Sequence, residues 1–72
     1  MTKKYIIINL ENDSYYDGSN YSKEQITRNN FSNYAPNAMK LDSIEEAEKY
    51  IKNIINCNVY GIFTIIEIYE KE

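Results

Sequence analysis

The stretch from Ser43 to Ile55, SIEEAEKYIKNII, constrains the fold of this chain more than any other part of the sequence. Its apolar side chains recur at intervals of three and four residues, which predicts a helix with one apolar stripe. Ser43 and Glu46 have the spacing of a capping box, in which each side chain accepts a hydrogen bond from a free backbone N–H at the helix start. The stripe consists of Ile44, Ala47, Ile51, Ile54 and Ile55. Such a helix must pack on a second element, so the flanking segments are expected to supply a surface for it.

Two segments have the composition of β-strands. The first, from Lys4 to Leu10, is rich in β-branched and aromatic residues whose alternate side chains fall on two faces. The second, from Val59 to Tyr69, is apolar on both faces as far as Ile66. An apolar pattern on both faces predicts a central strand, or a strand covered by a partner.

The sequence between the first strand and the helix has a weaker pattern. Tyr15 and Tyr16 follow a polar turn and are expected to begin a short returning strand. No period is sustained from Ser19 to Asn37. Pro36 is expected to open a short helical turn at Asn37–Met39, because its fixed φ suits a first helical position. A brief extended piece at residues 40–41 is expected before the main helix.

The order of these elements predicts a single α+β domain spanning residues 1–72. One amphipathic helix would pack on a three- to four-stranded, mainly antiparallel sheet. We expect the first and last strands to pair in the middle of that sheet.

The composition argues against several classes of function. The net charge of −3 and the single arginine, Arg28, disfavour a protein that neutralises phosphates, so direct binding of nucleic acid is not expected. The chain has no histidine, and Cys57 falls at a helix C-terminus, where the dipole disfavours a thiolate. Asp13 and Asp17 do not have the spacing of a calcium loop. We therefore expect no enzymatic activity, no cofactor and no metal.

The sequence also gives an expectation for location. No apolar run approaches the ~20 residues of a membrane-spanning helix, and the first residues lack the pattern of a signal peptide. A lone cysteine suits a reducing compartment. The predicted location is the cytoplasm of a bacterial host cell, without a membrane partner.

Eight tyrosines are more than one small core needs, and three of them surround the turn at residues 17–20. Tyrosine offers a large contact area at small entropic cost, and short polar side chains add hydrogen bonds, as in protein-binding surfaces. The candidate partner-binding residues are Tyr15, Tyr16, Asp17, Asn20, Tyr21 and Tyr34. The other interpretation, in which the rings serve as core and as cover for the sheet, stays open.

Three segments, KYIIINLENDSYYDG, APNAMKLDSIEEAEKYI and FTIIEIY, resemble a diffuse group of small phage and mobile-element proteins of low-GC bacteria. Similar size and acidity are common among anti-CRISPR proteins and other phage inhibitors of host defence. The resemblance implies a protein that binds a host protein or ribonucleoprotein complex and blocks nucleic-acid access or a conformational step. The alternative is a structural or regulatory homodimer assembled through the C-terminal strand, which could pair with a second copy if it lies at the rim of the sheet.

Overall fold

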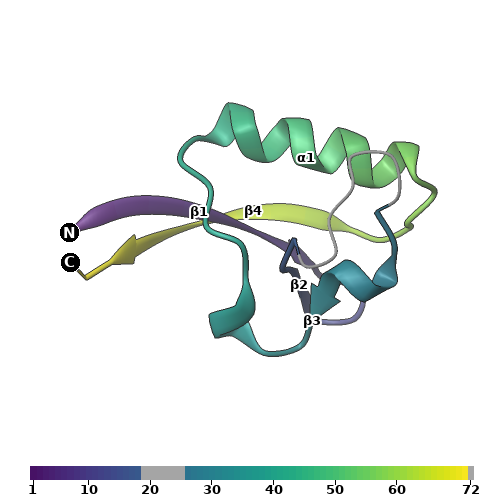
Figure 1. The fold of residues 1–72 in the computed structure, drawn as a ribbon, viewed down its shortest axis with the longest axis horizontal. Helices are drawn as coiled ribbons and strands as arrows, with labels where there is room; N and C mark the ends of the chain where they lie inside the picture. The colour runs from purple at the N-terminus through teal and green to yellow at the C-terminus, as the bar shows by residue number, and fades with distance from the viewer. Residues whose placement is uncertain (19–25, 72) are drawn as a thin grey trace.

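Residues 1–18 and 26–71 are described by a computed structural model of the chain. A single long helix, α1 (Ile44–Asn56), lies across one face of an antiparallel sheet. Figure 1 shows α1 above the sheet and the 3-10 turn η2 (Ala35–Asn37) below it. The predicted α+β fold, with one amphipathic helix on a mainly antiparallel sheet, is confirmed. Within the described ranges no helix is long and apolar enough to cross a membrane.

The sheet has four strands in the order β3-β2-β1-β4. Their bounds are β1 (Thr2–Asn9), β2 (Ser14–Tyr16), β3 (Phe31–Ser32) and β4 (Phe63–Glu70). β1 and β2 form the predicted hairpin, and β3 follows a 3-10 turn, η1 (Arg28–Asn30). β1 is therefore an interior strand.

β1 and β4 pair along eight residues, from Thr2 opposite Glu70 to Asn9 opposite Phe63. The predicted pairing of the first and last strands is confirmed. Of the two positions predicted for the last strand, the central one is wrong, because β4 forms an edge of the sheet. The other, a strand covered by a partner, stays a prediction. Only one face of β4 packs on the core, where Phe63 and Ile65 contact the buried cluster under α1. The other face carries Ile66, which is 36% exposed, so its apolar character does not reflect burial.

The helix begins at the predicted cap, Ser43, although only the Ser43 half of the predicted capping box forms. The N–H of Glu46 donates a hydrogen bond to the Ser43 hydroxyl at 3.1 Å, and Glu45 and Glu46 lie in the first turn, where the helix dipole favours negative charge. At the other end the Cys57 N–H donates to the Asn53 carbonyl, and Asn58 takes a left-handed φ of 62°. Local sequence signals thus set both ends of α1.

Replacing Ser43 with alanine is expected to lower the free energy of unfolding by about 1 kcal/mol, because the N–H of Glu46 loses its side-chain acceptor. Ser43→Asn is the matched control, since asparagine supplies an acceptor of similar reach. Urea denaturation followed by circular dichroism measures the difference. Equal stability of the two variants would contradict a capping role for Ser43.

The core lies between α1 and the helix-facing side of the sheet. It consists of Ile7, Tyr16, Ile26, Leu41, Ala47, Ile54 and Val59. The Tyr16 ring packs against the rings of Phe31 and Tyr50, with centroids 5.5 and 5.6 Å away. Of the predicted helix stripe, Ala47 and Ile54 are buried, but Ile44 and Ile55 are 46% and 55% exposed.

The connection before α1 passes alongside β1 and forms one bridge with it. Leu41 and Tyr5 exchange two backbone hydrogen bonds of 2.8 and 2.9 Å, which confirms the expected extended piece at residues 40–41. The 3-10 turn near Pro36 spans Ala35–Asn37, not Asn37–Met39 as predicted. Tyr34 is the residue before the turn, so Pro36 is the second residue of the turn and does not precede it.

Candidate protein-binding site

The structure separates the tyrosines that the sequence predicts to bind a partner. Tyr16 is 0% exposed and belongs to the core, which is the other interpretation that the sequence leaves open for these rings. Tyr15 points to the opposite face of the sheet, because successive strand residues alternate, and it is half-buried. Asn20 and Tyr21 lie outside the described residues.

Tyr34 is 64% exposed and remains available for contact. Its N–H donates to the Ser32 hydroxyl at 3.1 Å, and Ser32 lies directly opposite Tyr15 in the sheet. Asp17 is half-buried, and its N–H donates to the Asn30 carbonyl at 2.8 Å. Tyr15 and Tyr34 thus come from adjacent parts of the fold, while Tyr16 lies in the core.

A hollow of about 330 Å³ lies at the end of the sheet where β1 turns into β2. Three chain segments form it: the β1–β2 turn, the segment around η1 and β3, and the loop between α1 and β4. Its lining consists of Asn9, Glu11, Asn12, Ser14, Arg28, Phe31, Asn33, Val59 and Tyr60. Polar side chains therefore dominate the walls, with Phe31 and Val59 as apolar patches.

Hydrogen bonds hold one wall of this hollow. The Asn9 Oδ1 accepts from the N–H groups of Glu11 and Ile62, at 3.0 and 3.1 Å. The Asn12 Oδ1 accepts from both the N–H and the hydroxyl of Ser14, at 3.2 and 2.5 Å. Because Asn9 and Ser14 are buried, this wall is fixed before any partner arrives.

Two exposed side chains, Arg28 and Tyr60, complete the hollow. Tyr60 is 75% exposed, and Arg28 is exposed and makes no ion pair with any residue in the described ranges. A guanidinium group donates several hydrogen bonds in a fixed plane, and a phenol ring adds a flat apolar face with a polar tip. Together they suit an acceptor-bearing side chain of another protein.

The sequence alone did not identify Arg28 or Tyr60 as contact residues. Tyr60 falls inside the predicted strand Val59–Tyr69, whereas β4 begins at Phe63 and leaves Tyr60 in a loop. The left-handed Asn58 is the signal that places this loop after the helix. Across residues 1–18 and 26–71 no three His, Cys, Asp or Glu side chains gather in a way that could hold a metal ion.

The hollow is thus a preformed concave site with one cation, one exposed ring and a fixed polar wall. Such a site can bind a side chain or a short loop of a partner. Comparisons with models of protein families, with curated proteins and with solved structures found no match for this chain.

Proposed function

We propose that this chain is a non-enzymatic protein-binding module whose contact site is the hollow between Tyr60 and Arg28. The observation that carries the proposal is that these two side chains, both exposed, line the same concavity. Tyrosine and arginine are among the residue types that dominate binding energy at protein interfaces. The fixed Asn9 wall beside them lowers the ordering cost of binding.

The partner offers a carboxylate or carbonyl group to Arg28 and an apolar stem to the Tyr60 ring. The resemblance to small phage inhibitors supports a bacterial defence protein or ribonucleoprotein complex as that partner. Binding there blocks nucleic-acid access or a conformational step, in the cytoplasm of the host cell. The net charge of −3 favours such a protein contact over direct contact with nucleic acid.

A photo-crosslinking phenylalanine analogue placed at position 60 tests the site in bacterial cells that carry a defence complex. The expected result is one specific crosslinked component of that complex, lost when Arg28→Ala is added. The matched control carries the analogue at position 34, where the native tyrosine is also exposed. Crosslinking from position 34 alone would favour the tyrosine surface predicted from the sequence, and equal capture from both would contradict the hollow as the site.

Tyr60→Ala and Arg28→Ala are each expected to weaken binding of that component about 30-fold, as truncation of a binding hot spot does. Tyr34→Ala is expected to change the dissociation constant less than about threefold, and all three chains keep their free energy of unfolding because these side chains are exposed. Calorimetric titration measures the affinities.

A phage-challenge assay measures the inhibitory role: the wild-type chain restores phage growth on a defended host, and Tyr60→Ala does not.

A further inference from the structure

β4 directs half of its backbone groups away from the sheet. On the side of β1 that faces away from β4, Tyr5 exchanges backbone hydrogen bonds with Leu41. On the side that faces β4, the Leu10 N–H donates to the Ile62 carbonyl. Because the bonding direction alternates along an antiparallel strand, the even-numbered residues of β1 face β4. In the register of the two strands, the outward N–H and C=O groups of β4 then belong to Phe63, Ile65, Glu67 and Tyr69.

This edge lacks most of the usual protections against pairing, although β4 carries two glutamates, Glu67 and Glu70. β4 contains no proline, glycine or lysine, and its register with β1 runs over eight residues without a bulge. No described strand pairs with its outer side. The opposite edge of the sheet, β3, has only two residues. One long regular edge is therefore open.

An apolar flank of α1 lies on the same side of the molecule. The Tyr50 ring contacts Tyr16 of β2, so this flank of the helix faces the β2 side of the sheet. Ile44, Ile51 and Ile55 fall on the opposite flank at helical spacing, which is the β4 side. Ile44 and Ile55 are 46% and 55% exposed there. Figure 1 shows α1 running along β1 and β4.

We propose that two copies of this chain form a dimer by antiparallel pairing of β4 with β4 about a twofold axis at Ile66. Phe63 then lies opposite the second copy's Tyr69, and Ile65 opposite the second copy's Glu67. Each such pair exchanges two backbone hydrogen bonds, so every outward N–H and C=O group of β4 is satisfied. The axis is perpendicular to the sheet, so both helices lie on one face, with their Ile44 and Ile55 flanks turned toward each other.

Neighbouring registers are less favourable. An axis at Glu67 places the two Glu67 carboxylates directly opposite, and like charges in that position destabilise a sheet. An axis at Ile65 leaves Tyr69 opposite Gly61, which lies outside β4. The register at Ile66 avoids both and places Ile66 against its own copy, at a non-hydrogen-bonded position where side chains approach most closely.

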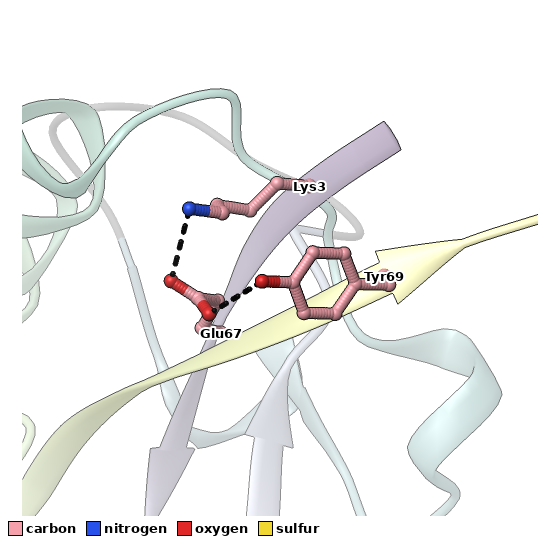
Figure 2. A network of polar contacts seen from close by, with 3 residues as sticks. All are labelled: Lys3, Glu67 and Tyr69. Atoms are coloured by element: carbon pink, nitrogen blue, oxygen red, sulfur yellow. Dashed lines mark hydrogen bonds and ion pairs between the residues drawn. The ribbon is translucent and has the colours of Figure 1, made fainter. Parts of the chain in front are cut away.

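The charge in the middle of β4 is balanced within its own copy. Figure 2 shows Glu67 between Lys3 of β1 and Tyr69: the Lys3 Nζ lies 3.5 Å from Glu67 Oε1, and the Tyr69 hydroxyl donates to Glu67 Oε2 at 3.1 Å. The Glu67 carboxylate raises the pKa of Lys3 above its ordinary value. Since pairing of the two β4 edges uses the long edge of each copy, association closes at two copies and does not extend into a fibre.

The mass of the intact chain in solution is the first test. Sedimentation equilibrium is expected to give about 17 kDa, twice the 8.5 kDa of one chain, at high concentration. Ile66→Lys brings two ammonium groups together at the axis and is expected to raise the dissociation constant about a hundredfold. Leu10→Lys is the control, because Leu10 is also exposed but lies beyond the end of β1, away from the β4 edge. A monomer at every concentration, or a dimer that Ile66→Lys leaves intact, would overturn the proposal.

Disulfide formation in a Cys57→Ser background tests the register on a nearly native chain. Ile66→Cys is expected to form an intermolecular disulfide on mild oxidation, because Cα atoms at such a position lie about 4.5 Å apart. Thr64→Cys is the control, since the two copies of Thr64 would lie about 13 Å apart along the strands. No crosslink from position 66, or equal crosslinking from both, would overturn the register. Neither experiment involves Tyr60 or Arg28, so its outcome is independent of the proposed binding site.

Discussion

Leu41→Ala is expected to lower the free energy of unfolding by about 3–5 kcal/mol, several times the loss expected from removing the Ser43 cap. Leu41 is 1% exposed and belongs to the core cluster beneath α1. Replacing its isobutyl side chain with a methyl group leaves a cavity that the neighbouring strand cannot fill, because the Leu41 backbone is fixed by two hydrogen bonds to Tyr5. A chain of this length has a total stability of roughly 4–11 kcal/mol, so this variant is close to unfolding at room temperature.

Leu10→Ala is the matched control for that prediction. The side chain is shortened in the same way, but Leu10 is 52% exposed, so the free energy of unfolding is expected to fall by less than about 1 kcal/mol. Urea denaturation followed by tyrosine fluorescence measures both variants under the same conditions. A loss of similar size in the two variants would mean that Leu41 does not belong to the cooperative core.

Leu41 also shows which part of the fold local sequence patterns cannot predict. The stretch from Ser19 to Asn37 and the residues after it have no sustained period, yet Ile26 and Leu41 are among the most buried side chains. Leu41 reaches the core through an isolated bridge to Tyr5, from a distant part of the chain. A single bridge leaves no periodic pattern, so only the brief extended piece could be predicted.

The main helix and the first hairpin, whose signals are local, were predicted correctly. The helix follows from its cap and its apolar period, and the β1–β2 hairpin follows from turn residues between two strand-like runs. The edge position of β4 depends instead on which strands flank β1, which is a non-local choice. Its two apolar faces predict either a central strand or a strand covered by a partner, whereas in the structure only the face with Phe63 and Ile65 packs on the core.

The candidate site shows the same contrast between local signals, which the sequence reveals, and non-local contacts, which it does not. Alternation along a strand already implies that Tyr15 and Tyr16 point to opposite faces, which separates two of the predicted contact residues. The hollow could not be predicted, because Asn9, Arg28 and Tyr60 come from three segments that only the folded chain brings together. The hollow does contain tyrosine and asparagine, but none of the contact residues predicted from the sequence is among its lining residues.

Gly61→Ala is expected to lower the free energy of unfolding by about 2–4 kcal/mol. A Cβ atom at position 61 would overlap the side-chain amide of Asn9, closer than real Cβ contacts allow. Asn9 is 4% exposed, and its Oδ1 accepts hydrogen bonds from the N–H groups of Glu11 and Ile62. Moving the amide aside would break both bonds: the one from Ile62 joins the end of β1 to the residue before β4, and the one from Glu11 holds the β1–β2 turn.

A double-mutant cycle with Asn9→Ala tests this explanation. Asn9→Ala alone is expected to cost about 1–3 kcal/mol, because two N–H groups lose their shared acceptor. It also removes the atoms that a Cβ at position 61 would meet, so Gly61→Ala should cost little in that background, and the two losses should be non-additive by at least about 1 kcal/mol. Additive losses would show that Asn9 is not the group that requires glycine at position 61.

Gly18→Ala is the comparison that separates a steric conflict from backbone strain. Gly18 has a φ of 70°, where an alanine is strained, and its nearest neighbour in space is the flexible Met39 side chain. The loss of unfolding free energy in Gly18→Ala should therefore add to the loss in Asn9→Ala, because the two positions share no partner. Asn9 also lines the hollow, so Gly61→Ala should weaken partner binding while leaving Tyr60 and Arg28 in place. That result would tie the stability of the β1–β4 junction directly to the shape of the binding site.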